Sequence, residues 1–189
     1  ELPGDVSSQF ITGLLYALPP LEGDSELVLT TPLESKGYVE LTLEALAQFG
    51  IVAHPTETGW KVPGSQVGHP ADVTVEGDYS QASNYLVAAS MGNSLTVTGL
   101  STSSAQGDRI ICDYARQLDG TGTVILSVRQ CPDLVPALAV RAALRAGETT
   151  HIVDAARLRL KESDRLEAVT AELNKLGAQV EKTPEALII

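Results

Sequence analysis

Aromatic residues are scarce in this sequence: Phe, Trp and Tyr make up 4% of its 189 residues, although 43% are hydrophobic. A core must therefore be built mainly from Ala, Val, Leu and Ile. No apolar run approaches the ~20 residues that a membrane-spanning helix needs. We therefore expect a globular chain of one ordinary domain or two small ones, with no membrane as partner.

Cysteine is almost absent as well. The two residues, Cys112 and Cys131, have neither metal-ligand spacing nor the pattern of a disulfide framework. We expect both to be small buried hydrophobic side chains. The segment Glu1–Asp5 has no basic stretch followed by an apolar one, so it is not a signal peptide. These features favour a reducing, cytoplasmic location.

Positive charge is in deficit, with a formal net charge of -11. This charge argues against nucleic acid and anionic membranes as partners. It does not exclude a small anionic substrate, because a pocket needs only a local group of cations. One such group is present: Arg157, Arg159, Lys161 and Arg165 lie within nine residues. If the strand beginning near His151 persists, alternation places the first three on one face. We expect Arg159, Lys161 and Arg165 to converge on one cleft.

What the sequence does contain is a pattern repeated three times. Asp5, Asp78 and Asp133 each stand just before an almost wholly apolar stretch, where they fit helix N-caps or first-turn acids. The helices that follow are apolar nearly all round, so we expect them to be buried. Each repeat ends in a glycine, and 45, 42 and 44 residues separate the three aspartates from Gly50, Gly120 and Gly177.

Each repeat continues with a strand and then an amphipathic helix. The expected strands are 27–31, 94–98 and 149–153, and the expected helices are 38–49, 107–118 and 161–176. A strand pair, 52–54 with 60–62, completes the first repeat. Residues 62–70 are rich in Gly and Pro and indicate a linker or hinge. The last expected strand, 186–189, stops in apolar residues, so we expect that the chain was cut or processed there.

Four short motifs within these repeats resemble those of a known protein family. They are Ser7-Ser8-Gln9-Phe10-Ile11-Thr12, Glu34-Ser35-Lys36-Gly37-Tyr38, Val75-Glu76-Gly77-Asp78 and Leu160-Lys161-Glu162-Ser163-Asp164-Arg165-Leu166. In this order the chain resembles the 5-enolpyruvylshikimate-3-phosphate synthases of the enolpyruvyl transferase fold. The resemblance implies an α/β (α+β) fold of helix-strand-helix-strand repeats, with buried helices and outer sheets in an inside-out barrel. It implies that residues 1–63 are the last repeat of an N-terminal lobe, 64–71 a hinge, and 72–189 the first two repeats of a C-terminal lobe.

The resemblance also implies roles for particular residues. Ser7, Ser8 and Ser35 would bind the phosphate of shikimate 3-phosphate, Gln9 would bridge both substrates, and Tyr38 would contact the sugar-like ring. Asp133 would accept a hydrogen bond from the 5-hydroxyl, and Glu162 would be the acid/base. Lys161 and Arg157 would bind substrate, and Arg165 would grip phosphoenolpyruvate. Gly37 stands where proline is common in the family, which leaves the role of Tyr38 less constrained.

The residues alone leave simpler interpretations open for each motif. The serines at 7 and 8 fit plain helix capping, and a Ser35-Lys36 turn fits an ordinary ST-turn. Asp133 fits an N-cap fully. The charged run from Arg157 to Arg165 fits a solvated surface with a Glu–Arg pair.

The chemistry implied by the resemblance explains why such side chains are wanted. Transfer of the enolpyruvyl group requires one acid/base to protonate and later deprotonate the same carbon, while cations hold two anionic substrates. No metal or cofactor is implied, and the complete enzyme, over twice as long, is expected to be monomeric. This fragment alone is expected to be inactive. The alternatives are a UDP-N-acetylglucosamine enolpyruvyl transferase, or a non-catalytic fragment of the same fold.

Overall fold

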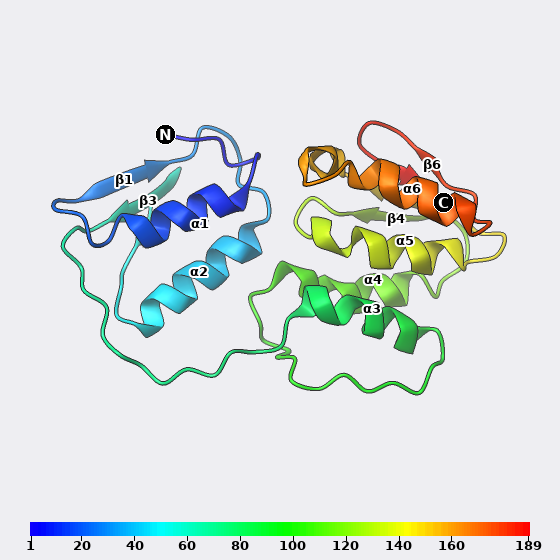
Figure 1. Cartoon of the computed structure of the whole chain (residues 1–189), viewed down its shortest axis with the longest axis horizontal. Coiled ribbons are helices and arrows are strands. Elements are labelled where there is room, and N and C mark those ends of the chain that lie inside the picture. Colours follow the sequence, from blue (N-terminus) through cyan, green and yellow to red (C-terminus); the bar gives the residue numbers. More distant parts are fainter. The chain divides into compact units, whose positions relative to one another are not determined.

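The computed structural model describes all residues, 1–189 (Figure 1). Its contacts divide the chain into two compact units. Unit 1 comprises Glu1–Val75 with Ala105–Gly107, and unit 2 comprises Glu76–Ser104 with Asp108–Ile189. Between Pro63 and Asp78 the chain forms neither helix nor strand. No helix in either unit has the length and apolar composition needed to cross a bilayer.

Unit 1 is a three-stranded antiparallel sheet with two helices. In chain order its elements are α1 (Ser8–Ala17), β1 (Ser25–Val28), α2 (Lys36–Gln48), β2 (His54–Pro55) and β3 (Gly59–Val62). The strands are ordered β1-β3-β2, with Leu27 opposite Trp60. The core of this unit includes Ile11 and Leu15 of α1, one helical turn apart, and Val39 and Leu46 of α2.

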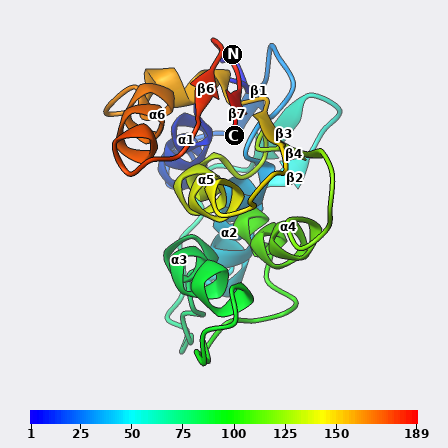
Figure 2. The ribbon, with the colours of Figure 1, turned by 90° about the vertical axis from the view of Figure 1, so that its right-hand side faces the viewer.

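Unit 2 contains the longer series of elements. Its α-helices are α3 (Tyr79–Ser90), α4 (Ile111–Gln117), α5 (Val135–Ala143) and α6 (Arg165–Lys175). Its strands are β4 (Val124–Ser127), β5 (Thr150–Val153), β6 (Glu181–Lys182) and β7 (Leu187–Ile188). Its short 3₁₀ helices are η1 (Gly107–Ile110), whose first residue belongs to unit 1, η2 (Pro132–Leu134) and η3 (Ala156–Leu160). Figure 2 views α3, α4, α5 and α6 nearly end-on, so their axes run in much the same direction.

The sheet of unit 2 has the strand order β4-β5-β7-β6. Strands β4 and β5 are parallel, with Ser127 opposite Val153, whereas the other neighbours are antiparallel. Parallel neighbours need a crossover connection, and η2 with α5 provides it. Helix α5 contacts α3, α4, α6 and β5. It therefore lies at the centre of the unit, as the expected buried helix of the third repeat should.

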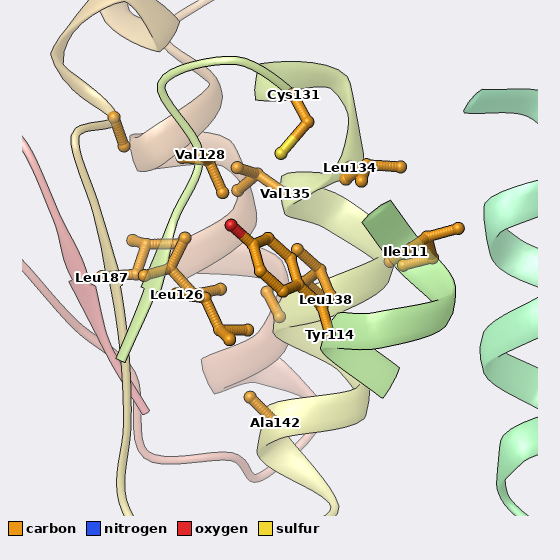
Figure 3. Packing of buried hydrophobic residues seen from close by; sticks show 14 of the residues in the cluster. Ile111, Tyr114, Leu126, Val128, Cys131, Leu134, Val135, Leu138, Ala142 and Leu187 are labelled. Atoms are coloured by element: carbon orange, nitrogen blue, oxygen red, sulfur yellow. The ribbon is translucent and has the colours of Figure 1, made fainter. Parts of the chain in front are cut away.

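The core of unit 2 is dominated by aliphatic side chains and also contains two buried tyrosines, Tyr79 and Tyr114. Figure 3 shows the surroundings of Tyr114. Tyr114 of α4 packs in the same cluster as Leu126 of β4 and Leu138 of α5. Its hydroxyl donates a hydrogen bond of 2.6 Å to the carbonyl of Ser127. Because burial disfavours the phenolate, it raises the pKa of Tyr114 to about 12. Tyr114 thus ties α4 to the end of β4 as a neutral donor.

Several local expectations from the sequence are wrong. Residues 94–98 form no strand, because β-branched residues favour an extended chain but a strand also needs a hydrogen-bonded neighbour. Helix α1 is not buried all round: Phe10 and Tyr16 are more than half exposed. Cys131 is buried, and burial raises the pKa of its thiol to about 12, but Cys112 is exposed on α4.

The aspartates of the three repeats also differ from one another. Asp78 caps α3 as expected, accepting hydrogen bonds from the backbone N–H groups of Ser80 and Gln81. Asp5 is not a cap; it accepts a 2.7 Å bond from the Thr31 hydroxyl, and Ser7 caps α1 instead. Asp133 lies inside η2 and pairs with an arginine described below. The three aspartates are therefore similarly spaced along the sequence but have different hydrogen-bond partners.

Arg145, a buried arginine just after α5, bonds to the segments that lead into β4 and β5. The Arg145 side chain donates five hydrogen bonds of 2.7–3.0 Å, and Arg145 is only 7% exposed. Its acceptors are Leu118 O, Gly120 O, Gly122 O, Thr149 O and Thr150 Oγ1. These groups lie after α4 and at the start of β5, so one guanidinium joins two connections that precede the parallel strands.

Arg145→Met should lower the free energy of unfolding by about 3 kcal/mol, because five acceptors lose this donor and two of them belong to the buried residues Leu118 and Thr150. Arg145→Lys should lose less, since an ammonium group still donates to some of them. Arg116→Met, which breaks an exposed pair with Asp113, is the control and should change stability by less than about 0.5 kcal/mol. Urea unfolding followed by circular dichroism measures all three. Equal midpoints for Arg145→Met and the unaltered chain would contradict the assignment.

Candidate active site

Charged side chains gather where the parallel strands β4 and β5 end. The carboxyl ends of neighbouring parallel strands meet at one edge of a sheet, and ligands of α/β proteins commonly bind there. In unit 2 the chain leaving β4 enters η2 through Arg129, and the chain leaving β5 enters η3 through Asp154. Helix α6 begins at Arg165. Three connections thus bring their polar residues to this edge.

Arg165 is the centre of this arrangement. Its Nη1 lies 2.5 Å from Oδ1 of Asp133, and its Nη2 lies 2.7 Å from Oε1 of Glu162. Nε also donates to the same Glu162 oxygen, at 3.2 Å. The Arg165 side chain is 24% exposed, whereas that of Glu162 is 70% exposed. Three residues singled out in the sequence therefore form one hydrogen-bonded cluster.

The hydrogen bond from Arg165 is the main cause that lowers the pKa of Glu162 below its usual range, with a smaller charge effect from Lys161. Asp164 differs, although it lies two residues away. Its carboxylate caps α6 by accepting from the Glu167 N–H at 3.1 Å, and this bond is the main cause that lowers the pKa of Asp164. The carboxylates of Glu162 and Asp164 are therefore ionised at neutral pH.

Arg157, Arg159 and Lys161 do not lie along one face of a strand, as the expected alternation would have placed them. The expected strand does not persist beyond Val153; residues 156–160 form η3, which has about three residues per turn, so alternate residues diverge. Arg157 donates to the carbonyl of Arg129 at 2.8 Å. Arg159 lies 3.6 Å from Asp164 and lines a separate cavity of about 220 Å³ with Lys182. Arg165 does not line that cavity, and the convergence of Arg159, Lys161 and Arg165 on one cleft stays a prediction. Lys161 is half-buried directly after η3.

In unit 1 the serines before α1 occupy different environments. Ser7 is the N-cap, and its hydroxyl accepts from the Gln9 N–H at 3.3 Å, so capping explains this residue. Ser8 is 6% exposed within the first turn of the helix, and capping does not explain it. Gln9 is exposed. The first turn of α1 therefore holds a buried hydroxyl close to N–H groups that lack helical partners.

Ser35 is unusual among the predicted site residues. It precedes α2 with a φ of 55°, a left-handed conformation that few residues other than glycine adopt, and it is only 3% exposed. Its side chain makes no capping hydrogen bond to α2, so simple capping does not explain it. Tyr38 is half-buried in the first turn of the same helix. Strained backbone of this kind is frequent at functional sites.

Sequence reasoning missed Ser127, Arg129 and Asp154. The Asp154 carboxylate accepts from the Ser127 hydroxyl at 2.6 Å and from Arg129 Nη2 at 2.8 Å. The only signal in the sequence was the position of Asp154 directly after a strand. No group of three or more His, Cys, Asp or Glu side chains in the structure is arranged to hold a metal ion.

Comparisons with known proteins agree on one family. The family model described as EPSP synthase (3-phosphoshikimate 1-carboxyvinyltransferase) matches residues 1–189. Proteins named 3-phosphoshikimate 1-carboxyvinyltransferase from Clostridium kluyveri and Clostridium acetobutylicum are 46% and 45% identical, over 98% and 100% of this chain. The chain spans 47% of the length of each of these two curated relatives.

A solved structure supports the fold. EPSP synthase from Acinetobacter baumannii matches with a TM-score of 0.76 and 20% identity, over 100% of this chain and 47% of that one. At this identity the likeness concerns the fold alone. It confirms the mixed helix-and-sheet architecture expected from the repeats.

Replacement of Arg165 by methionine should raise the pKa of Glu162 towards its usual value, because the hydrogen bond that favours its ionised form is lost. Asp164 is the internal control: its pKa is lowered mainly by the Glu167 N–H and should stay where it is. Side-chain carboxyl resonances followed by NMR over an acid titration report both groups. A Glu162 titration identical in the two proteins would show that Arg165 does not hold this carboxylate in solution.

Proposed function

Because this chain belongs to the EPSP synthase (3-phosphoshikimate 1-carboxyvinyltransferase) family, we propose that it carries part of the active site for enolpyruvyl transfer. The reaction moves the enolpyruvyl group of phosphoenolpyruvate to the 5-hydroxyl of shikimate 3-phosphate and releases phosphate. The observation that carries the proposal is the cluster in which Arg165 holds both Asp133 and Glu162.

The cluster suits the two proton movements of this reaction. Glu162 protonates the methylene carbon of phosphoenolpyruvate, and the 5-hydroxyl then adds to the neighbouring carbon. Asp133 accepts the hydrogen bond of this hydroxyl and then its proton, which later passes to the departing phosphate. Glu162 removes a proton from the same methyl group as phosphate leaves. A carboxylate that is ionised at rest takes up a proton before the first step and recovers it in the last, so it acts as both acid and base.

The cations supply the anion-binding half of the site. The bonds of Arg165 to Asp133 and Glu162 use one hydrogen on each of its three nitrogens, and a guanidinium carries further N–H groups that can grip a carboxylate or phosphate. We assign Arg165 to phosphoenolpyruvate and Lys161 to shikimate 3-phosphate. Arg157, oriented by the Arg129 carbonyl, is the third substrate-binding cation.

Unit 1 supplies hydroxyl groups in this proposal. Ser7, Ser8 and Ser35 bind the phosphate of shikimate 3-phosphate, and a helix N-terminus such as that of α1 favours an anion. The burial of Ser8 and the left-handed backbone of Ser35 support these roles, since capping explains neither. Gln9 bridges the two substrates, and Tyr38 contacts the ring.

The lobe assignment is part of the same proposal. Residues 1–63 form the last repeat of an N-terminal lobe, 64–71 a hinge, and 72–189 the first two repeats of a C-terminal lobe. It is supported by the single pair of helices in unit 1, the two pairs in unit 2, and the absence of regular structure between Pro63 and Asp78.

A chimera tests the function. Residues 1–189 replace the matching segment of the Clostridium kluyveri relative, which supplies the rest of the protein. We expect phosphate release only when both substrates are present. Glu162→Gln should lower kcat by roughly 10²- to 10⁴-fold, the usual contribution of an acid/base. Glu172→Gln, an exposed glutamate of α6 paired with Lys175, is the matched control and should leave kcat unchanged. An unaltered chimera without phosphate release, or full activity in Glu162→Gln, would refute the proposal.

The 189-residue chain by itself should not turn over. It spans 47% of its curated relatives, and catalysis depends on holding two anions while excluding water. We therefore expect phosphate release at the background rate when the purified chain is mixed with both substrates. Weak binding of shikimate 3-phosphate remains compatible with this outcome. Turnover at a rate of about 1 s⁻¹ or more, as ordinary enzymes show, would contradict it.

A further inference from the structure

A carboxylate outside the predicted site joins the ends of both parallel strands. Asp154 directly follows β5, and Ser127, the last residue of β4, lies opposite Val153 in the register. One oxygen of Asp154 accepts from the Ser127 hydroxyl at 2.6 Å, and the other accepts from Arg129 Nη2 at 2.8 Å. Asp154 therefore fixes the last residue of β4 and the connection that leaves it.

The backbone of Asp154 adapts the chain to this role. Its φ is 61°, a left-handed conformation that Asp and Asn adopt more readily than other residues with a Cβ atom. The next residue, Ala155, donates its N–H to the Glu185 carbonyl and is 2% exposed. The chain thus turns out of β5 into η3 at this residue, with its side chain directed to β4. The bonds from Ser127 and Arg129 lower the pKa of Asp154, so the contact is one with a full negative charge.

The fixed connection leads to the proposed active site in two ways. The carbonyl of Arg129 accepts the hydrogen bond from Arg157, so the position of this carbonyl orients that guanidinium. From Arg129 the chain makes a tight turn, with Cys131 N–H donating to Val128 O and Leu134 N–H donating to Cys131 O. Asp133 lies in this turn and meets Arg165 at 2.5 Å. A shift of Arg129 therefore moves Asp133 and Arg157 together.

We propose that Asp154 is a positioning residue for enolpyruvyl transfer: through Arg129 and Ser127 it fixes the β4–α5 connection and thereby places Asp133 and Arg157. This inference rests on the proposed function for the roles of Asp133 and Arg157. Asp154 itself touches neither substrate in this scheme. Arg165 loses support from Asp133 when this connection shifts but keeps its bond to Glu162, which lies outside the connection, so the grip on phosphoenolpyruvate is affected less than that on shikimate 3-phosphate.

Substitutions at Asp154 in the chimera separate the carboxylate from the backbone. Asp154→Asn keeps the left-handed conformation and an acceptor for Ser127 but replaces the oxygen that Arg129 binds. Asp154→Gly keeps the conformation and removes the side chain. We expect both to lower kcat roughly 10- to 100-fold, as small misplacements of reacting groups do, and to raise the KM for shikimate 3-phosphate more than that for phosphoenolpyruvate. Asp113→Asn, which breaks the exposed Asp113–Arg116 pair of α4, is the matched control and should change none of these values.

Coupling distinguishes positioning from general destabilisation. If Asp154 acts through Arg129, the double variant Asp154→Asn with Arg129→Gln should be no slower than the slower single variant. Additive losses of kcat, or full activity in Asp154→Gly, would overturn the inference, because the carboxylate would then not act on this connection. Assays are run well below the thermal unfolding midpoint of every variant.

The outcomes also separate this inference from the proposed function. An unaltered chimera that releases no phosphate refutes the function, whereas an active chimera unaffected by Asp154→Asn refutes the positioning role alone. Hydrogen exchange on the 189-residue chain tests positioning without turnover. Asp154→Asn should speed exchange at the amides of Cys131 and Leu134 while the amide of Leu118 after α4 keeps its protection. Unchanged exchange at all three amides would overturn the inference.

Discussion

The parallel pairing of β4 with β5 is the constraint on which unit 2 depends. Two parallel strands cannot be joined by a tight turn, so η2 and α5 must cross from one edge of the sheet to the other. The crossover makes α5 central, because it covers the sheet and contacts α3, α4 and α6. It also makes the two edges unequal. One edge receives the connections that enter the strands, and the other receives those that leave them.

The two edges carry different charged side chains. A buried arginine lies at the entering edge, and partly exposed aspartates lie at the leaving edge. At the entering edge Arg145 is buried, and its bonded partners are neutral oxygens, so it serves to saturate backbone carbonyls. At the leaving edge Asp154 and Asp133 are partly exposed and bind guanidinium groups that also reach solvent. A buried charge costs free energy unless its hydrogen bonds are satisfied, whereas a partly exposed charge with spare donors can bind a ligand. The proposed site therefore lies at the leaving edge.

The sequence predicted helices and short motifs better than it predicted which distant residues pair or hydrogen-bond with one another. Hydrophobic spacing identified α5 and α6, and the resemblance identified Asp133, Glu162 and Arg165, because these signals are contained in short segments. The strand at 94–98 was wrong because pairing depends on a neighbour far along the chain. The form of 156–160 was also wrong: Leu158 is fully buried and Ala155 is bonded to Glu185, and these long-range contacts favour a 3₁₀ turn over an extended strand. Asp154 was missed because its partners are 25 and 27 residues away.

The cations at the leaving edge are oriented before any anion arrives. Arg165 is held by two carboxylates, Arg157 by the carbonyl of Arg129, and Arg129 by Asp154. A long side chain ordered in advance does not lose that freedom again when an anion binds, so more of the interaction is kept as affinity. The carboxylates have a second effect, since they balance positive charges that would otherwise repel one another. In a chain with a net charge of -11, the acidic residues at this edge are thus compatible with the proposed anion site, because they orient its cations.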